Sequence, residues 1–316
     1  MSAPSLTKSK DKATRDSFGE AIRDLASEFP KIVVLDADLS VSTKSVLFAK
    51  AFPDRFFQMG IAESNMVGTA AGLSFTGLIP FCCSFGAFVA GRYETIRVSV
   101  GYSKANVKIV GTHSGLGIGD DGYTQMGLED INVMRGLPGM IVLNPSDDAT
   151  TKAAVRFATT HVGPVYLRLT RQKLPSLHQT SDFKCGRGIV LQEGKEIALI
   201  GTGSTVNECL KASKILGNVN PWIVDIHTIK PIDRALIKTL ARSCKLIVTT
   251  EDHNVVGGLG TAVSEVLAEE GWNGRLVRLG VQDTYGESGD PEALYDKYGF
   301  SAQKIAEKVM SVSVSL

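Results

Sequence analysis

Glu63 is the residue whose type and position most strongly indicate chemistry. It stands in the segment MGIAESNM, residues 59–66, between an apolar run and the small-residue stretch SNMVGTAAGLSF. The helix dipole stabilises an acid in the first turn of a helix, so capping alone could explain this residue. A helix of such small residues must also pack closely against a neighbour, which would bury the acid. Because a buried carboxylate needs a partner, Glu63 is a candidate catalytic residue.

A long glycine-rich loop is the second candidate site. The segment GTHSGLGIGDDGYTQ, residues 111–125, follows an apolar run and contains His113, Asp121 and Gln125. Glycine at this density lets the backbone approach a ligand, and these side chains offer the donors and acceptors that a polyhydroxylated substrate needs. The loop is long for a structural turn, which favours function.

Two further segments have plain structural explanations. In DADLSVS, Asp36 and Asp38 have the spacing of a calcium loop, but Val41 and Leu47 stand where such a loop needs glycine and glutamate. Helix capping and a functional role both remain open for these aspartates. GTGSTV, residues 201–206, is half of a dinucleotide motif, and a tight strand-to-helix turn explains it at least as well.

The elements that must position these residues follow from hydrophobic periodicity. A helix from Thr14 precedes the strand-like run KIVVLDAD, and further apolar runs alternate with helical stretches to the end of the chain. This pattern predicts an α/β fold of two doubly wound domains with mainly parallel sheets. In parallel sheets ligands gather at the carboxyl ends of strands, so the candidate segments should share one edge.

The domain organisation follows from a break in this alternation. Residues 171–188, RQKLPSLHQTSDFKCGRG, lose the periodicity and contain polar turn residues, so they are the candidate linker. We expect a flexible N-terminus over residues 1–13, a first domain over 14–170 and a second, smaller domain over 189–316.

Composition excludes several classes of protein. The 316 residues include 34 basic and 33 acidic side chains, so the formal charge is +1 and a nucleic-acid partner is not expected. The first 13 residues lack the apolar core of a secretory signal, and no segment is long and apolar enough to span a membrane. We therefore expect a cytoplasmic protein with no membrane partner. The five cysteines lack zinc spacing, so no metal ligand is predicted.

The order of the motifs resembles the second half of the transketolase family. The segments are GIAESNMVGTAAGL, SFGAFVAGRYETIR, THSGLGIGDDGYTQMGLEDI, NPSD and LRLTRQ, and the resemblance covers almost the whole chain from ATRDSFGEAI onward. It implies a pyrimidine-binding domain for thiamine diphosphate, followed by a transketolase C-terminal domain.

The resemblance also supplies a partner for Glu63. In this family the glutamate of the GI-x-E motif hydrogen-bonds the aminopyrimidine ring and favours the tautomer that takes a proton from the thiazolium. Phe85 and Phe88 resemble the aromatic residues that hold the aminopyrimidine, with Tyr93 as a possible third. Gln125 matches a position that contacts the pyrimidine or the substrate.

The family pattern assigns the remaining residues to the sugar phosphate and the cofactor. His113 and Asp121 resemble residues that contact the donor sugar. Asp38 matches an acidic residue beside the cofactor that acts across a subunit interface. The residues that resemble phosphate-binding residues of the family are Arg15, Ser42 and Arg171.

One family motif is missing from the sequence. The diphosphate and Mg²⁺ motif, GDG followed by an asparagine some 25 to 30 residues later, does not occur. The implied enzyme is split: a separate subunit, equivalent to the transketolase N-terminal section, supplies that half of the site in a dimer of heterodimers. The expected reaction is transfer of a two-carbon ketol unit from a ketose phosphate to an aldose acceptor.

Three alternatives remain open. The beta subunit of a 2-oxoacid dehydrogenase has the same glutamate motif, but its relatives lack the His113–Gly122 loop pattern. Deoxyxylulose phosphate synthase shares the D-G loop but typically has arginine near the position of Ser114. A non-catalytic regulatory relative would retain the fold alone.

Overall fold

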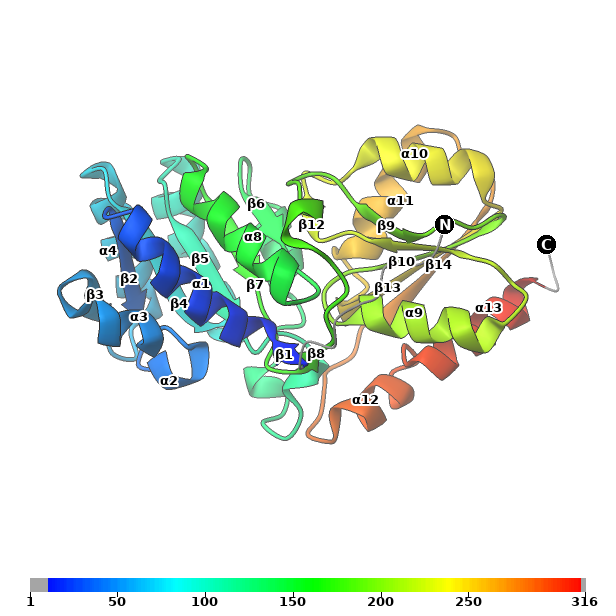
Figure 1. The fold of residues 1–316 in the computed structure, drawn as a ribbon, viewed down its shortest axis with the longest axis horizontal. Coiled ribbons are helices and arrows are strands. Elements are labelled where there is room, and N and C mark those ends of the chain that lie inside the picture. The colour runs from blue at the N-terminus through cyan, green and yellow to red at the C-terminus, as the bar shows by residue number, and fades with distance from the viewer. Residues whose placement is uncertain (1–10, 314–316) are drawn as a thin grey trace.

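The apolar runs of the sequence form the strands of two mainly parallel sheets. The computed structural model describes residues 11–313, and Figure 1 shows its two α/β units side by side along the long axis. Most of the expected flexible stretch, residues 1–13, lies outside the described residues. Lys12 and Ala13 form the short strand β1, which pairs antiparallel with β8.

The first sheet has seven strands in the order β12-β6-β7-β5-β4-β2-β3. All neighbours pair parallel except β12, which lies antiparallel to β6 at one edge. Every residue of β2 is buried, as a strand covered on both faces requires. The strands are β2 (Ile32–Asp36), β3 (Phe56–Gln58), β4 (Ile79–Phe85), β5 (Lys108–Thr112), β6 (Ile141–Leu143), β7 (Val165–Arg168) and β12 (Thr228–Lys230).

Helices cover both faces of this sheet. Phe18, Ile22 and Leu25 recur at helical spacing on α1, and all three are buried against one face. That face is covered by α1 (Thr14–Glu28), α3 (Val46–Ala51) and α8 (Asp148–Thr160). The other is covered by α4 (Glu63–Phe75), α5 (Gly86–Ala90), the π-helical segment η2 (Ile96–Tyr102) and α7 (Asp130–Arg135). The short helices between these are α2 (Ser40–Thr43), α6 (Tyr93–Thr95), η1 (Pro53–Arg55), η3 (Leu116–Ile118) and η4 (Tyr123–Gln125).

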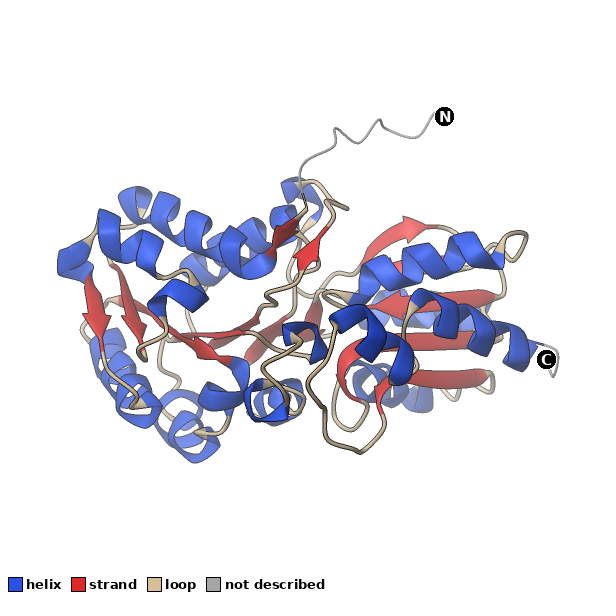
Figure 2. Cartoon of the chain, turned by 90° about the horizontal axis from the view of Figure 1, so that it is seen from below, coloured by secondary structure: helices blue, strands red, loops and turns tan. Residues whose placement is uncertain are grey.

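The second sheet has five strands in the order β14-β13-β10-β11-β9, of which only β9 is antiparallel. Figure 2 shows helices on both sides of it. The strands are β9 (Ile189–Gln192), β10 (Ile197–Gly201), β11 (Trp222–Asp225), β13 (Leu246–Asn254) and β14 (Arg275–Val281). One face packs on α10 (Arg234–Ser243) and α11 (Leu259–Glu269), the other on α9 (Thr205–Leu216), α12 (Pro291–Lys297) and α13 (Ala302–Ser313).

The two units are joined by a shared strand and a shared buried cluster as well as by the linker. The strand β12 belongs to the second half of the chain yet completes the first sheet, and one buried cluster continues through both units, including Val142, Ile226 and Ile229. Residues 171–188 contain β8 (Lys173–Leu174) and η5 (Thr180–Asp182). The sequence pattern did not predict β12 or β8, because runs of two or three residues carry no periodic signal.

None of the helices within residues 11–313 combines the length and the apolar character needed to span a bilayer.

Candidate active site

The carboxyl ends of β2, β4 and β5 lie next to one another at one edge of the first sheet, because these strands pair parallel in the order β5-β4-β2. Asp36 ends β2, Phe85 ends β4, and His113 directly follows β5. The predicted segments therefore do share one edge, and their side chains can act on one ligand.

The loop after β2 is held by a buried acid. The carboxylate of Asp36 accepts hydrogen bonds from the Leu39 backbone N–H at 2.6 Å and from the hydroxyls of Thr43 and Ser45 at 2.7 and 2.8 Å. Asp36 therefore has a structural role, as the capping interpretation allowed. Asp38, two residues on, is exposed with a φ of 63°, and its backbone N–H donates to Gln58 Oε1 at 2.7 Å.

Arg15, Ser42 and His113 meet although they are distant in sequence. The Arg15 guanidinium donates to the backbone carbonyl of Ser42 at 3.1 Å and to His113 Nε2 at 2.6 Å. Arginine cannot accept a hydrogen bond, so Nε2 is the acceptor and the Nδ1–H of His113 faces the Thr112 hydroxyl at 2.8 Å. Ser42 contributes its backbone carbonyl to this contact, and the phosphate contact that the family resemblance implies for Ser42 stays a prediction.

Positive charge gathers around this contact. Burial first of all, and then the charges of Arg15, Arg171 and Lys44, lower the pKa of His113 to about 3. The imidazole is therefore neutral at pH 7. Burial and the charge of Arg171 also lower the pKa of Arg15, against the nearby Asp16 and Asp121. Three cations around a neutral histidine favour an anionic ligand.

Arg171 and Asp121 form a second contact at this edge. Arg171 lies 3.3 Å from the Asp121 carboxylate, and both side chains are partly exposed. Lys44, which was not predicted as a site residue, follows α2 in the left-handed conformation with a φ of 69°. A lysine two residues after Ser42 was the available signal, but sequence spacing alone does not say where its side chain points.

Glu63 occupies the first turn of α4 and is 6% exposed. Its nearest cation is Arg92, whose Nε lies 4.0 Å from the carboxylate. Within residues 11–313 no group donates a hydrogen bond to this acid at hydrogen-bonding distance. Glu63 is thus a nearly buried carboxylate whose acceptor capacity is left for a ligand.

An aromatic wall lies beside His113. Phe85 stacks on Phe88 with ring centroids 5.4 Å apart and on His113 with centroids 3.8 Å apart. Tyr93, the possible third aromatic residue, is 37% exposed and lies in α6, shortly after Phe88 in the chain. A stacked pair of phenylalanines provides a flat apolar surface of the kind that a heteroaromatic ring prefers.

Gln125 ends the turn η4, in the glycine-rich loop. No hydrogen bond or ion pair joins the side chain of Gln125 or of Asp38 to other residues of the described chain. The loops after β2 and β5 carry Asp38 and Gln125, respectively, at this edge of the sheet. Among residues 11–313 no group of three or more acids, histidines and cysteines could hold a metal ion, and the five cysteines are unpaired thiols.

The chain matches two known domain families in succession. Residues 10–176 match the transketolase pyrimidine-binding domain, and residues 186–305 match the transketolase C-terminal domain. The first match alone covers more than half of the chain.

Individual relatives point to the same family as the two domain matches. A putative transketolase C-terminal section of Methanocaldococcus jannaschii is 43% identical over 95% of this chain and 96% of its own length. Human transketolase is 36% identical over 98% of this chain, which spans 50% of that protein. Among solved structures, a split-gene transketolase described as an inactive beta4 tetramer is 47% identical with a TM-score of 0.88, covering 95% of this chain and 97% of its own. The chain therefore belongs to the transketolase family, whose members depend on thiamine diphosphate.

Proposed function

We propose that this chain is one subunit of a split transketolase that transfers a two-carbon ketol unit from a ketose phosphate to an aldose acceptor. The observation that carries the proposal is that one sheet edge holds a buried acid, an aromatic wall and a cationic cluster. An acid and an aromatic wall suit a cofactor ring, and the cations suit a sugar phosphate.

The surroundings of Glu63 fit the aminopyrimidine of thiamine diphosphate. The carboxylate is nearly buried and accepts no hydrogen bond from the described chain, while Phe85 and Phe88 present a flat apolar surface. When bound, this cofactor supplies the carbon nucleophile and the electron sink for ketol transfer. Glu63 would share a proton with a ring nitrogen, and its low exposure keeps water from that hydrogen bond.

The cationic cluster fits the phosphate of the donor. Arg15 and Arg171 carry planar forks that match phosphate oxygens, and Lys44 adds a third positive charge. Because His113 is neutral, it can exchange its contact with Arg15 for a hydrogen bond with a sugar hydroxyl. Asp121, held 3.3 Å from Arg171, would accept from another hydroxyl.

A separate subunit would bind the diphosphate and Mg²⁺. The sequence lacks the GDG and asparagine motif. In support, the matched relative from M. jannaschii is named as a C-terminal section, and this chain aligns with 96% of it. The exposed Asp38 and the partly exposed Gln125 would then face the cofactor from this side of the interface.

Self-association would cover the outer face of α4. Additional Cβ atoms on Gly68 and Gly72 would have no neighbour within 4 Å, so this small-residue face is open. Ile61, just before the helix, is 84% exposed, and Phe75 at its end is 65% exposed. A second copy packed here would bury apolar surface next to Glu63, which supports the proposed dimer of heterodimers.

Reconstitution tests the proposal. The chain is mixed with a candidate diphosphate-domain subunit, thiamine diphosphate and Mg²⁺, and assayed with xylulose 5-phosphate plus ribose 5-phosphate. We expect ketol transfer only in the mixture. Turnover with pyruvate as the only substrate would instead favour a 2-oxoacid dehydrogenase type, and activity with pyruvate plus glyceraldehyde 3-phosphate a deoxyxylulose phosphate synthase type.

Two further outcomes would contradict the proposal. Tight cofactor binding and ketol transfer by the chain alone would refute the split arrangement. A stable complex that turns over none of these substrates would favour a non-catalytic regulatory relative.

A further inference from the structure

The carboxyl edge of the second sheet is filled by the first unit. In an open parallel sheet this edge is the usual ligand site. Here a Cβ added to Gly203, in the GTGSTV turn, would meet the side chain of Asn144 at 2.7 Å. Beside it, the Ser146 hydroxyl donates to the Asp225 carboxylate at 2.6 Å. The half-motif at 201–206 is therefore a packing turn, and the function of this edge must be sought in what it contacts.

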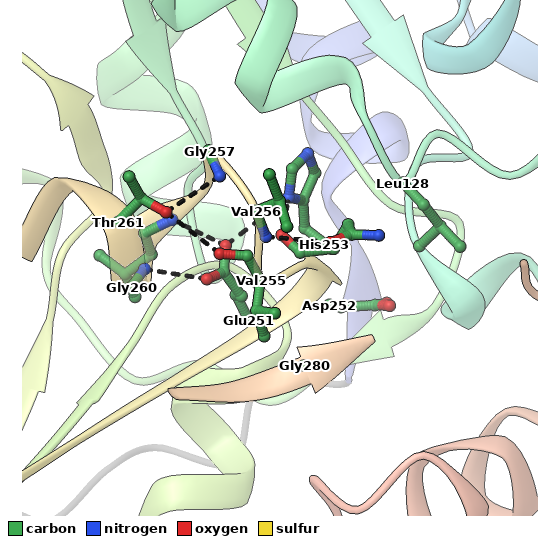
Figure 3. Close-up of polar contacts among 12 residues, drawn as sticks. Leu128, Glu251, Asp252, His253, Val255, Val256, Gly257, Gly260, Thr261 and Gly280 are labelled. Carbon is green, nitrogen blue, oxygen red and sulfur yellow. Dashed lines mark hydrogen bonds and ion pairs between the residues drawn. The ribbon is translucent and has the colours of Figure 1, made fainter. Parts of the chain in front are cut away.

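Asp252, near the end of β13, reaches the glycine-rich loop of the first unit. Its Oδ1 accepts a hydrogen bond from the Leu116 N–H at 2.6 Å, and its Oδ2 from the Gly117 N–H at 3.1 Å. The Tyr295 hydroxyl lies 2.7 Å from Oδ2. Figure 3 shows Asp252 pointing away from Glu251, as alternation along a strand requires. The hydrogen bonds of this buried acid therefore fix the loop at the turn η3.

Gly115 is required for this contact. Its φ is +91°, and a Cβ at this position would lie 2.2 Å from Asp252 Oδ2. A side chain here would both strain the backbone and push the carboxylate away from the loop. The glycine that looked like an adaptation to a ligand thus makes room for Asp252.

The same strand end also holds the far end of the loop. Arg168, the last residue of β7, donates to the carbonyls of Gly127 and Asp252 at 2.9 and 2.8 Å and so joins the loop to β13. The backbone N–H of Asn254 donates to the Leu128 carbonyl at 2.9 Å, in the region drawn in Figure 3. Residues 252 and 254 of β13 therefore hold residues 116–117 and 128, while Arg168 ties Gly127 to the Asp252 carbonyl. The stretch between these points carries Asp121 and Gln125.

We propose that Asp252 is a positioning residue for donor binding: it fixes the turn at residues 115–117 and thereby holds Asp121 against the donor sugar. This inference rests on the proposed function and assigns a task to the C-terminal domain. A carboxylate suits the task because it accepts from two adjacent backbone N–H groups, and charge-assisted hydrogen bonds of this kind are stronger than neutral ones.

Hydrogen exchange of the full chain alone tests the structural half. In Asp252→Asn the side-chain amide has one acceptor oxygen where the carboxylate had two, so one of the two loop N–H groups loses its partner. We expect exchange in peptides covering residues 113–128 to rise about tenfold. Tyr295→Phe leaves both loop N–H contacts of Asp252 in place and removes the hydroxyl that contacts Asp252, Gln172 and Ser204. It should therefore give a smaller rise, and it serves if Asp252→Asn does not fold.

Glu251→Gln is the matched control. Glu251 is equally buried on the same strand, but its carboxylate accepts from Leu259 and Gly260 in the first turn of α11, at 2.7 and 2.9 Å. This variant should leave exchange in the 113–128 peptides within about twofold of the wild type. Unchanged loop exchange in Asp252→Asn, or an equal rise in both variants, would overturn the positioning role.

Kinetics of the reconstituted enzyme test the functional half. In Asp252→Asn the KM for the ketose phosphate should rise about tenfold, while the KM for the aldose acceptor stays within about twofold. Faster loop exchange with an unaltered donor KM would refute the link to donor binding. Absence of ketol transfer in the wild-type mixture would refute the proposed function instead, and the exchange comparison would still decide whether Asp252 holds the loop.

Discussion

Replacing Glu63 by glutamine should separate the stability of the chain from the activity of the enzyme. The substitution keeps the size of the side chain and removes its charge and its ability to share a proton. In the proposed function that ability is the whole contribution of the residue, because Glu63 would act on the aminopyrimidine ring through one hydrogen bond.

The structure predicts a small effect on folding. Glu63 accepts no hydrogen bond within residues 11–313, and its nearest cation, Arg92 Nε, is 4.0 Å away on a side chain that is 49% exposed. Loss of such a loose pair costs at most about 1 kcal/mol. Loss of a positioned acid–base group lowers turnover by about a hundredfold or more. The variant should therefore unfold nearly as the wild type does and yet be nearly inactive.

Urea unfolding of the chain and ketol transfer by the reconstituted enzyme measure the two quantities. Glu28→Gln is the control, because Glu28 lies at the distant end of α1 and loses a surface ion pair with Arg156 at 2.6 Å. The control should keep both stability and turnover. Near-normal turnover in Glu63→Gln would refute the assignment, as would a loss of stability large enough to explain the inactivity.

The remaining predictions concern charges and one open face. Arg168→Met leaves the fully buried Asp130 without the guanidinium 2.9 Å away, so the free energy of unfolding should fall by about 3–5 kcal/mol, and a fall below about 1 kcal/mol in urea would contradict this. Burial raises the pKa of Glu251 from 4.5 to about 7, so the native state binds this proton more tightly than the unfolded chain, and stability should decline as the pH rises between these values, by up to about 3 kcal/mol. In Glu251→Gln this part of the decline should vanish, and an unaltered pH profile of urea midpoints would show that another group causes it. Arg171→Ala should raise the donor KM about tenfold with little change in cofactor affinity, whereas an equal change in both would argue against a phosphate contact. Gly72→Arg should weaken self-association in sedimentation without lowering the melting temperature of the chain, and unchanged association would exclude the α4 face.

Much of the site could be inferred from sequence because its residues stand at strand ends. Phe85 ends β4, and His113 follows β5, so the parallel sheet alone brings them to one edge, where they stack at 3.8 Å. Lys44 was missed because its charge reaches His113 only through the left-handed turn after α2. Ser42 presents its carbonyl to Arg15, a backbone contact that residue type alone does not predict.

Hydrophobic periodicity is local, so the sequence was enough to predict the alternation of the longer strands and helices and the polar segments that follow β2, β4 and β5. Tertiary packing was needed to show that β12 crosses into the first sheet and that Asp252 reaches Leu116, 136 residues away, in the glycine-rich loop. Such contacts depend on how two complete units pack together. Glu63 shows both halves of this division: its place at the start of α4 follows from sequence, whereas its low exposure and its lack of a hydrogen-bond donor among residues 11–313 follow from packing.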